Sequence, residues 1–137
     1  MRTITLAAFT LMTTLLAPSV SLSETPMTAE EFDRYTRGKT LYFSDENGRY
    51  GGEEYFDRRR VRWSFLDGEC KEGTWYASGR DICFVYEDNP EPQCWQFFVN
   101  AGGGLTATYS NDDSDTTLYE VTGDDEEMIC LGPEVGV

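Results

Sequence analysis

Apolar and polar residues alternate along short stretches over most of the chain, and this pattern predicts β-strands. The clearest stretch is 60–66, where Val61, Trp63 and Phe65 alternate with polar residues. Similar stretches, separated by Gly- and Asp-containing turns, follow one another at 39–44, 50–56, 69–77, 81–86, 93–99, 105–109, 117–121 and, as a short last one, 128–131. We therefore predict a mainly β fold, an antiparallel meander of about eight strands that closes into a small barrel and so has no free edge. An open sandwich is the alternative.

One short helix is predicted before the strands, at 29–37. Thr28 and Glu31 have the spacing of a capping box, in which each side chain accepts a hydrogen bond from the other's backbone. Gly38 is typical of the residue that ends a helix. No other segment of the sequence has a comparable pattern.

The first 23 residues have the pattern of a secretory signal peptide. A basic start is followed by a mostly apolar stretch at 4–17 and then by small residues. The stretch is shorter than the roughly 20 apolar residues that span a bilayer. We predict cleavage after Ser21 or Ser23, with 24–137 as a single disulfide-bonded β domain that is periplasmic or secreted. An uncleaved N-terminal anchor is the alternative.

The four cysteines, Cys70, Cys83, Cys94 and Cys130, predict two disulfides, since even numbers of cysteine in small exported domains usually pair. Three pairings are possible. A hairpin centred on 88–89 would place Cys83 directly opposite Cys94, within reach of a disulfide. We favour that pair, which leaves Cys70 with Cys130. A zinc site is the competing interpretation, but the cysteines lack the close pairs typical of zinc ligands.

The segment between residues 73 and 95 contains a recognisable motif. Gly73-Thr74-Trp75, Gly79, Ile82-Cys83-Phe84 and Cys94-Trp95 form the pattern G-x-W…G-x-x-I-C-F…C-W. The pattern, within 39–99, resembles small exported alphaproteobacterial proteins that carry a domain of unknown function. The resemblance implies a lipocalin-like β-meander, and it implies no catalytic residue.

Charge and composition narrow the classes of function. The chain has 11 Lys plus Arg, 25 Asp plus Glu and no His, which gives a net charge of −14. Removal of 1–23 would take away one Arg and no acidic residue, leaving −15. A protein this acidic repels nucleic acid, and without His it has no Ser-His or Cys-His pair. We therefore predict a monomeric protein that is not an enzyme and needs no cofactor.

The candidate ligand-binding residues are mostly aromatic. In eight-stranded barrels, rings on the inner face either fill the interior or line a cavity, and for a chain this short we favour a filled core. The candidates are Tyr42, Tyr55, Arg62, Trp63, Trp75 and Trp95. Whether Trp63 and Trp75 share a face depends on whether the turn at Asp67-Gly68 contains a bulge. Arg62 belongs to the basic cluster 58–62, which either binds an anion or pairs with the protein's own carboxylates.

Clusters of acidic residues are the remaining candidates. Glu53-Glu54 with Asp57, and Glu69 with Glu72, could supply paired carboxylates for catalysis, but we interpret them as solvated charges at strand edges. The stretches 112–115 and 124–127 offer oxygen ligands for Ca²⁺ without the spacing of an EF-hand. We interpret both as solvated loops and predict no metal site.

These observations favour an exported, non-enzymatic β-barrel that binds a small apolar molecule or an envelope protein. The alternative is an acidic inhibitor of an exported basic protein such as a lysozyme or a protease, because a strongly negative charge accelerates association with a cationic partner. In that case the proline-containing loop expected at 87–92 would be the contact surface.

Overall fold

The structure is a computed structural model that describes residues 25–122 and 127–132. The predicted signal peptide and its cleavage site lie outside these residues, as does most of the acidic stretch 124–127.

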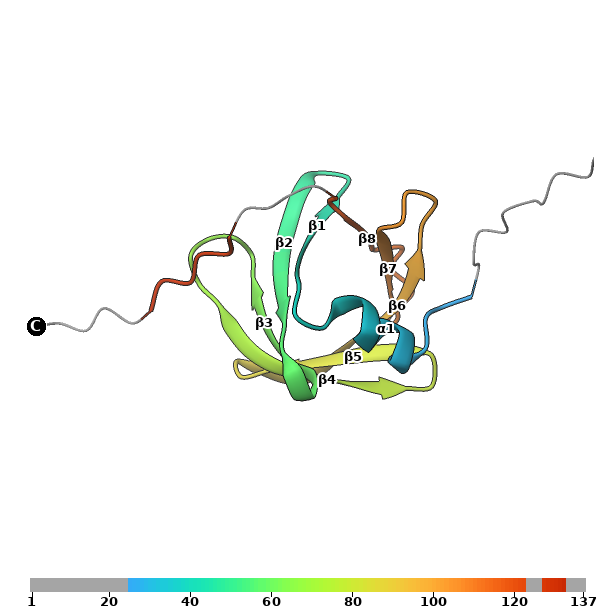
Figure 1. Ribbon diagram of the computed structural model, residues 1–137, viewed down its shortest axis with the longest axis horizontal. Helices are drawn as coiled ribbons and strands as arrows, with labels where there is room; N and C mark the ends of the chain where they lie inside the picture. Colours follow the sequence, from blue (N-terminus) through green and yellow to red (C-terminus); the bar gives the residue numbers. More distant parts are fainter. Residues whose placement is uncertain (1–24, 123–126, 133–137) are drawn as a thin grey trace, which may run out of the picture.

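Eight antiparallel strands form a closed barrel (Figure 1). They are β1 (Thr40–Asp45), β2 (Gly48–Tyr55), β3 (Arg60–Ser64), β4 (Lys71–Ser78), β5 (Asp81–Tyr86), β6 (Asn89–Val99), β7 (Leu105–Tyr109) and β8 (Thr117–Glu120). Each strand pairs with the next one in the chain, and β1 also pairs with β8 through Phe43↔Glu120 and Ser44↔Tyr119. The predicted meander and its closure are confirmed, and the open sandwich is wrong.

The predicted helix is confirmed as α1 (Ala29–Thr36). Its capping box is complete, because the Thr28 hydroxyl accepts from the Glu31 backbone N–H and the Glu31 carboxylate accepts from the Thr28 N–H. The chain leaves the helix at Gly38, whose φ of 76° favours glycine. Among the described residues, no helix has the length and apolar character needed to cross a membrane.

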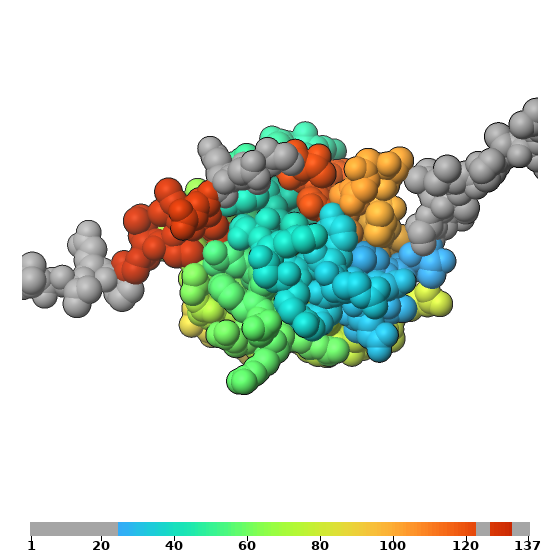
Figure 2. All heavy atoms as spheres, viewed as in Figure 1, coloured from blue at the N-terminus to red at the C-terminus, as the bar shows by residue number. Residues whose placement is uncertain are grey.

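The helix α1 closes one end of the barrel (Figures 1 and 2). Backbone hydrogen bonds hold it there, from the Met27 N–H to the Phe97 carbonyl at 2.7 Å and from the Gly38 N–H to the Tyr55 carbonyl at 2.8 Å. The Phe32 side chain is completely buried, and its ring packs within 6.3 Å, centroid to centroid, of the rings of Tyr55, Trp75, Phe84 and Phe97. The predicted filled core is therefore present at this end.

The predicted pairing of β5 and β6 is confirmed around the cysteines, but the register shifts between Phe84 and Tyr86, so the turn lies at 87–88 and not at 88–89. Cys83 lies opposite Cys94 and Ile82 lies opposite Trp95. Disulfides join Cys83 to Cys94 and Cys70 to Cys130, so the zinc interpretation is wrong.

The connection between β3 and β4 is longer than a two-residue hairpin turn. Trp63 pairs with Lys71, and residues 65–70 form the connection. Leu66 and Gly68 take positive φ values of 64° and 90°, which gives the longer turn its shape. The resulting register places Trp63 and Trp75 on the same, inner face of the barrel, which the sequence left open.

The loop expected at 87–92 is wrong, because β6 already begins at Asn89. Pro90 and Pro92 fit in this strand because the register with β5 shifts there and β5 pairs with neither proline, while β7 pairs only with the later part of β6, from Trp95 to Val99. The exposed surface expected of an inhibitor is therefore a tight turn at 87–88 followed by the start of β6, and an inhibitory function itself stays a prediction.

The last short strand expected at 128–131 is also wrong, since residues 127–132 carry no strand. Instead, the Cys70–Cys130 disulfide and a hydrogen bond from the Leu131 N–H to the Gly68 carbonyl hold this segment against the β3–β4 connection. Because the eight strands of the closed barrel pair with one another all the way round, the sheet has no free edge with which this segment could pair.

Candidate ligand-binding pocket

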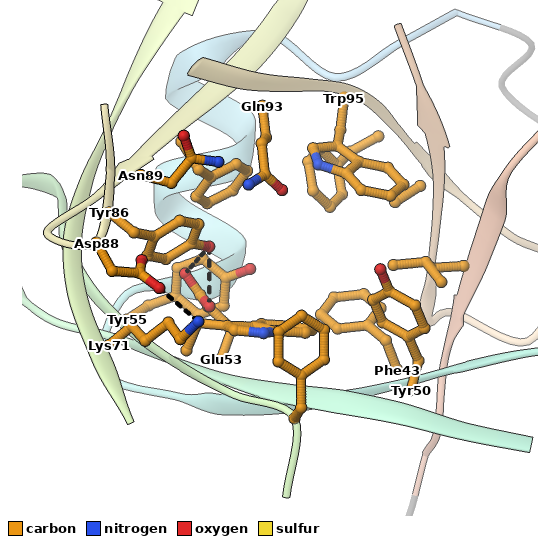
Figure 3. Close-up of a pocket in the computed structure, with 16 residues that line it drawn as sticks. Phe43, Tyr50, Glu53, Tyr55, Lys71, Tyr86, Asp88, Asn89, Gln93 and Trp95 are labelled. Atoms are coloured by element: carbon orange, nitrogen blue, oxygen red, sulfur yellow. Dashed lines mark hydrogen bonds and ion pairs between the residues drawn. The ribbon is translucent and has the colours of Figure 1, made fainter. Parts of the chain in front are cut away.

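The half of the barrel away from α1 contains a partly open cavity of about 140 Å³ (Figure 3). Because β1 starts next to α1 and successive strands alternate in direction, the β5–β6 turn, with Asp88, lies at the opposite end, and Asp88 lines this cavity. Nine of the lining residues are aromatic: Phe43, Tyr50, Tyr55, Trp63, Phe65, Phe84, Tyr86, Trp95 and Phe97. The others are Glu53, Lys71, Asp88, Asn89, Gln93, Ala107 and Leu118. The cavity is thus an aromatic pocket with a few polar groups.

Two glycines make room for the rings of the pocket wall. A Cβ atom on Gly51 would lie 2.2 Å from the Trp63 ring, and one on Gly73 would lie 2.7 Å from the Tyr86 ring. Both distances are far below van der Waals contact. The absence of a side chain at these positions lets the two rings lie against the barrel wall and leaves the centre of the pocket free.

Glu53 is the polar group at the inner part of this pocket. Strand alternation turns Glu53 and Tyr55 inward and Glu54 outward. The Glu53 side chain is only 2% exposed, and the Tyr86 hydroxyl donates to its two carboxylate oxygens at 3.1 and 3.2 Å (Figure 3). Among the described residues, no Lys or Arg forms an ion pair with Glu53.

The surroundings of Glu53 favour its neutral form. Burial raises the pKa of Glu53 well above its usual range; the hydrogen bond from Tyr86 opposes this shift, and the negative charge of Glu54 adds to it. Burial, together with the charge of Glu53, also raises the pKa values of Tyr55 and Tyr86. The Glu53 carboxyl group can therefore hold a proton inside the pocket, or release it to solvent when a cation enters.

The rim of the pocket carries charges that neutralise each other. The Lys71 Nζ atom lies 2.5 Å from an Asp88 carboxylate oxygen (Figure 3). It also lies 5.7 Å from the centre of the Phe65 ring. The rim therefore adds no strong net charge to the entrance.

Half of the predicted ligand-binding residues line this pocket, namely Tyr55, Trp63 and Trp95. Trp75 is also inside the barrel, but it belongs to the filled end, where it packs against Phe32 with the Arg59 guanidinium 4.5 Å from its ring centre. This residue supports the floor of the pocket and does not line it.

The other two candidates, Tyr42 and Arg62, lie on the outer face. Tyr42 is buried there beside Gly52, because its neighbour Phe43 takes the inward position on β1. Arg62 donates to Glu72 at 2.6 Å and to Glu54 at 3.2 Å. This confirms that Arg62 pairs with the protein's own carboxylates.

Sequence reasoning missed Glu53, which is buried and not a solvated charge at a strand edge. Among the other acidic candidates, Asp57, Glu69 and Glu72 are exposed as expected, and Glu54 is partly exposed and pairs with Arg62. One signal in the sequence could have identified Glu53. It is two residues from Tyr55 and therefore lies on the same face of the strand, whereas Glu54 lies on the opposite face.

Comparisons of this chain with protein-family models, with curated proteins and with solved structures found no match. The resemblance to small exported alphaproteobacterial proteins stays a prediction. The geometry of the pocket is therefore the basis for inferring a function.

Proposed function

We propose that this protein binds a small, mostly apolar ring compound in its aromatic pocket and does not convert it chemically. The observation that carries this proposal is the ring of nine aromatic side chains around a partly open cavity. Pockets that bind small molecules typically combine such apolar walls with a few polar groups that fix orientation. Glu53, Asn89 and Gln93 are polar groups of this kind.

The volume favours a compact ligand. Pockets for drug-sized molecules hold about 300–1,000 Å³, whereas an apolar cavity of about 150 Å³ is known to accept benzene. At about 140 Å³, this cavity suits a ligand with a single ring. A long acyl chain would require the space that Phe32 and its neighbours fill at the other end.

An exported location fits this proposal. Two disulfides are typical of proteins that fold in an oxidising compartment such as the periplasm or the extracellular space. We propose that the protein collects its ligand there.

Binding of a one-ring probe tests the proposal. We expect 2-phenylethanol to raise the melting temperature of the protein and to give a saturable signal in isothermal titration calorimetry, whereas palmitate should give neither. Ala107→Phe should abolish binding of 2-phenylethanol, because Ala107 lines the cavity and the added ring would fill it. Ala107→Leu is the milder form if the phenylalanine variant does not fold.

Ala77→Phe is the matched control, since Ala77 is exposed and does not line the pocket. This variant should bind 2-phenylethanol as the wild type does. If the wild type binds no ring compound, or if the two variants at Ala107 bind as well as the wild type, the pocket is not a binding site.

A further inference from the structure

The two acidic residues of the pocket differ in their partners. Asp88, at the rim, is paired with Lys71. Glu53, deeper inside, is 2% exposed and receives hydrogen bonds only from the neutral hydroxyl of Tyr86 among the described residues. The inner pocket therefore has a carboxyl group that lacks a matching cation.

A cation in the pocket would find two kinds of favourable contact. A buried carboxylate is costly unless an opposite charge pairs with it, so a cationic ligand would supply the missing charge. Aromatic faces also attract cations within about 6 Å of the ring centre. Tyr55, on the same strand as Glu53, and Tyr86, which hydrogen-bonds to Glu53, line the same cavity.

We propose that the ligand is a small aromatic amine whose ammonium group pairs with the Glu53 carboxylate while its ring packs among the aromatic side chains. This inference rests on the function proposed above and specifies its ligand class. The net charge of −14 raises the local concentration of cations around the protein, so it assists the same ligand.

The main rival is a neutral ligand whose carbonyl accepts a hydrogen bond from protonated Glu53. Proton balance separates the two. The groups near Glu53 are Tyr55 on its own strand, Tyr86 on β5, Glu54 on the outer face, and the Lys71–Asp88 pair at the rim. Of these, Glu53 is the group whose carboxyl proton an entering cation would displace, since burial raises its pKa above the ordinary value. An ammonium ligand expels that proton into solution, whereas a carbonyl ligand retains it.

Three probes of similar shape test the charge of the ligand: phenethylamine is a cation at pH 7, 2-phenylethanol is neutral and 3-phenylpropionate is an anion. Charge-assisted hydrogen bonds in proteins contribute enough to change affinity by about tenfold or more. We expect phenethylamine to bind at least about tenfold more tightly than 2-phenylethanol, and 3-phenylpropionate to bind more weakly than either. Calorimetry in two buffers of different ionisation enthalpy should show proton release with the amine alone.

Glu53→Gln should remove the preference for the cation, so that phenethylamine binds this variant no more tightly than 2-phenylethanol does. Glu54→Gln is the matched control, because it removes the same charge from the neighbouring, outward position, and it should bind phenethylamine as the wild type does. Tyr86→Phe, which keeps the carboxyl group, should still prefer the amine. The amine affinity of the wild type should rise as pH increases above 4.5, because Glu53 then loses its proton.

The possible failures are distinguishable. If 2-phenylethanol binds but phenethylamine binds no better, or if Glu53→Gln leaves the preference intact, the amine inference is wrong and the proposed ring-binding function stands. If the affinity of the wild type for phenethylamine falls as pH rises, binding requires the protonated form of Glu53, which favours the neutral carbonyl ligand. If none of the three probes binds, the proposed function itself fails.

Discussion

Glu53 and Glu54 are adjacent and chemically identical, yet they have opposite environments. Glu54 faces solvent and pairs with Arg62, whereas Glu53 faces the pocket and contacts the Tyr86 hydroxyl. A buried carboxyl group is more stable when it is protonated, because desolvation penalises its charged form. The side of the strand on which a glutamate lies thus decides whether it is a surface charge or a binding group.

This difference predicts how stability depends on pH. The pKa of Glu53 in the folded protein is raised above its ordinary value of 4.5. Its contribution to stability is therefore complete below pH 4.5 and is lost as pH rises through the folded-state pKa. Glu53→Gln does not titrate and removes this loss.

We expect the melting temperature of the ligand-free wild type to fall relative to that of Glu53→Gln as pH increases from 4 to 8. Circular dichroism of both proteins across this range measures the difference. A constant difference would mean that the folded and unfolded states bind a proton at Glu53 equally well.

At the scale of single elements, α1 decides which part of the barrel is filled. Its one fully buried aromatic side chain, Phe32, contacts rings from β2, β4, β5 and β6. The helix therefore acts as the floor beneath the pocket as well as the cover of one barrel end.

Phe32→Ala should lower the free energy of unfolding by about 3–5 kcal/mol, because it leaves a cavity among these rings. Urea denaturation followed by tryptophan fluorescence measures this loss. Tyr119→Ala is the control: Tyr119 is 51% exposed on β8, and its removal should cost less than about 1 kcal/mol. A similar loss for both variants would show that α1 is not packed as described.

Which strand pairings could be predicted depended on local constraints. Cys83 and Cys94 fixed the β5–β6 register, because their spacing and the apolar alternation around them agree on one pairing. The β3–β4 register could not be predicted, because Asp67-Gly68 signals a two-residue turn while Leu66, an unusual residue for positive φ, makes the connection longer. The start of β6 was missed because prolines normally exclude a strand, and only the tertiary pairing shows where their N–H groups are not needed.

At the scale of the whole molecule, the pocket itself could not be predicted. Tyr55, Trp63 and Trp95 were identified as inward aromatic residues, but a cavity depends on how all rings share the interior. Gly51 and Gly73 leave room for the rings of Trp63 and Tyr86, which come from other strands. Phe32, from the helix, fills the interior at the other end. A local sequence pattern therefore does not predict how much of the interior the side chains leave empty.

The disulfides should contribute unequally to the stability of the whole domain. Cys70–Cys130 joins residues 60 apart, and Cys83–Cys94 joins residues 11 apart. The chain-entropy model gives about 4 kcal/mol for the longer loop and about 3 kcal/mol for the shorter one. We expect Cys70→Ser/Cys130→Ser to lose more stability in urea than Cys83→Ser/Cys94→Ser. The reverse order would show that native packing around the β5–β6 bridge outweighs the effect on the unfolded chain.

The bond from Cys130 to Cys70 also determines how the molecule responds to mechanical force. A pull on the chain end beyond Cys130 passes through the disulfide to Cys70, next to the first residue of β4. The pull therefore bypasses β8, the strand that completes the barrel with β1. While the bond is intact, tension at the carboxyl end cannot peel off the closing strand, and the barrel must be opened from within its sheet. Reduction of this single bond would transfer the tension to β8, whose four residues would then unzip first.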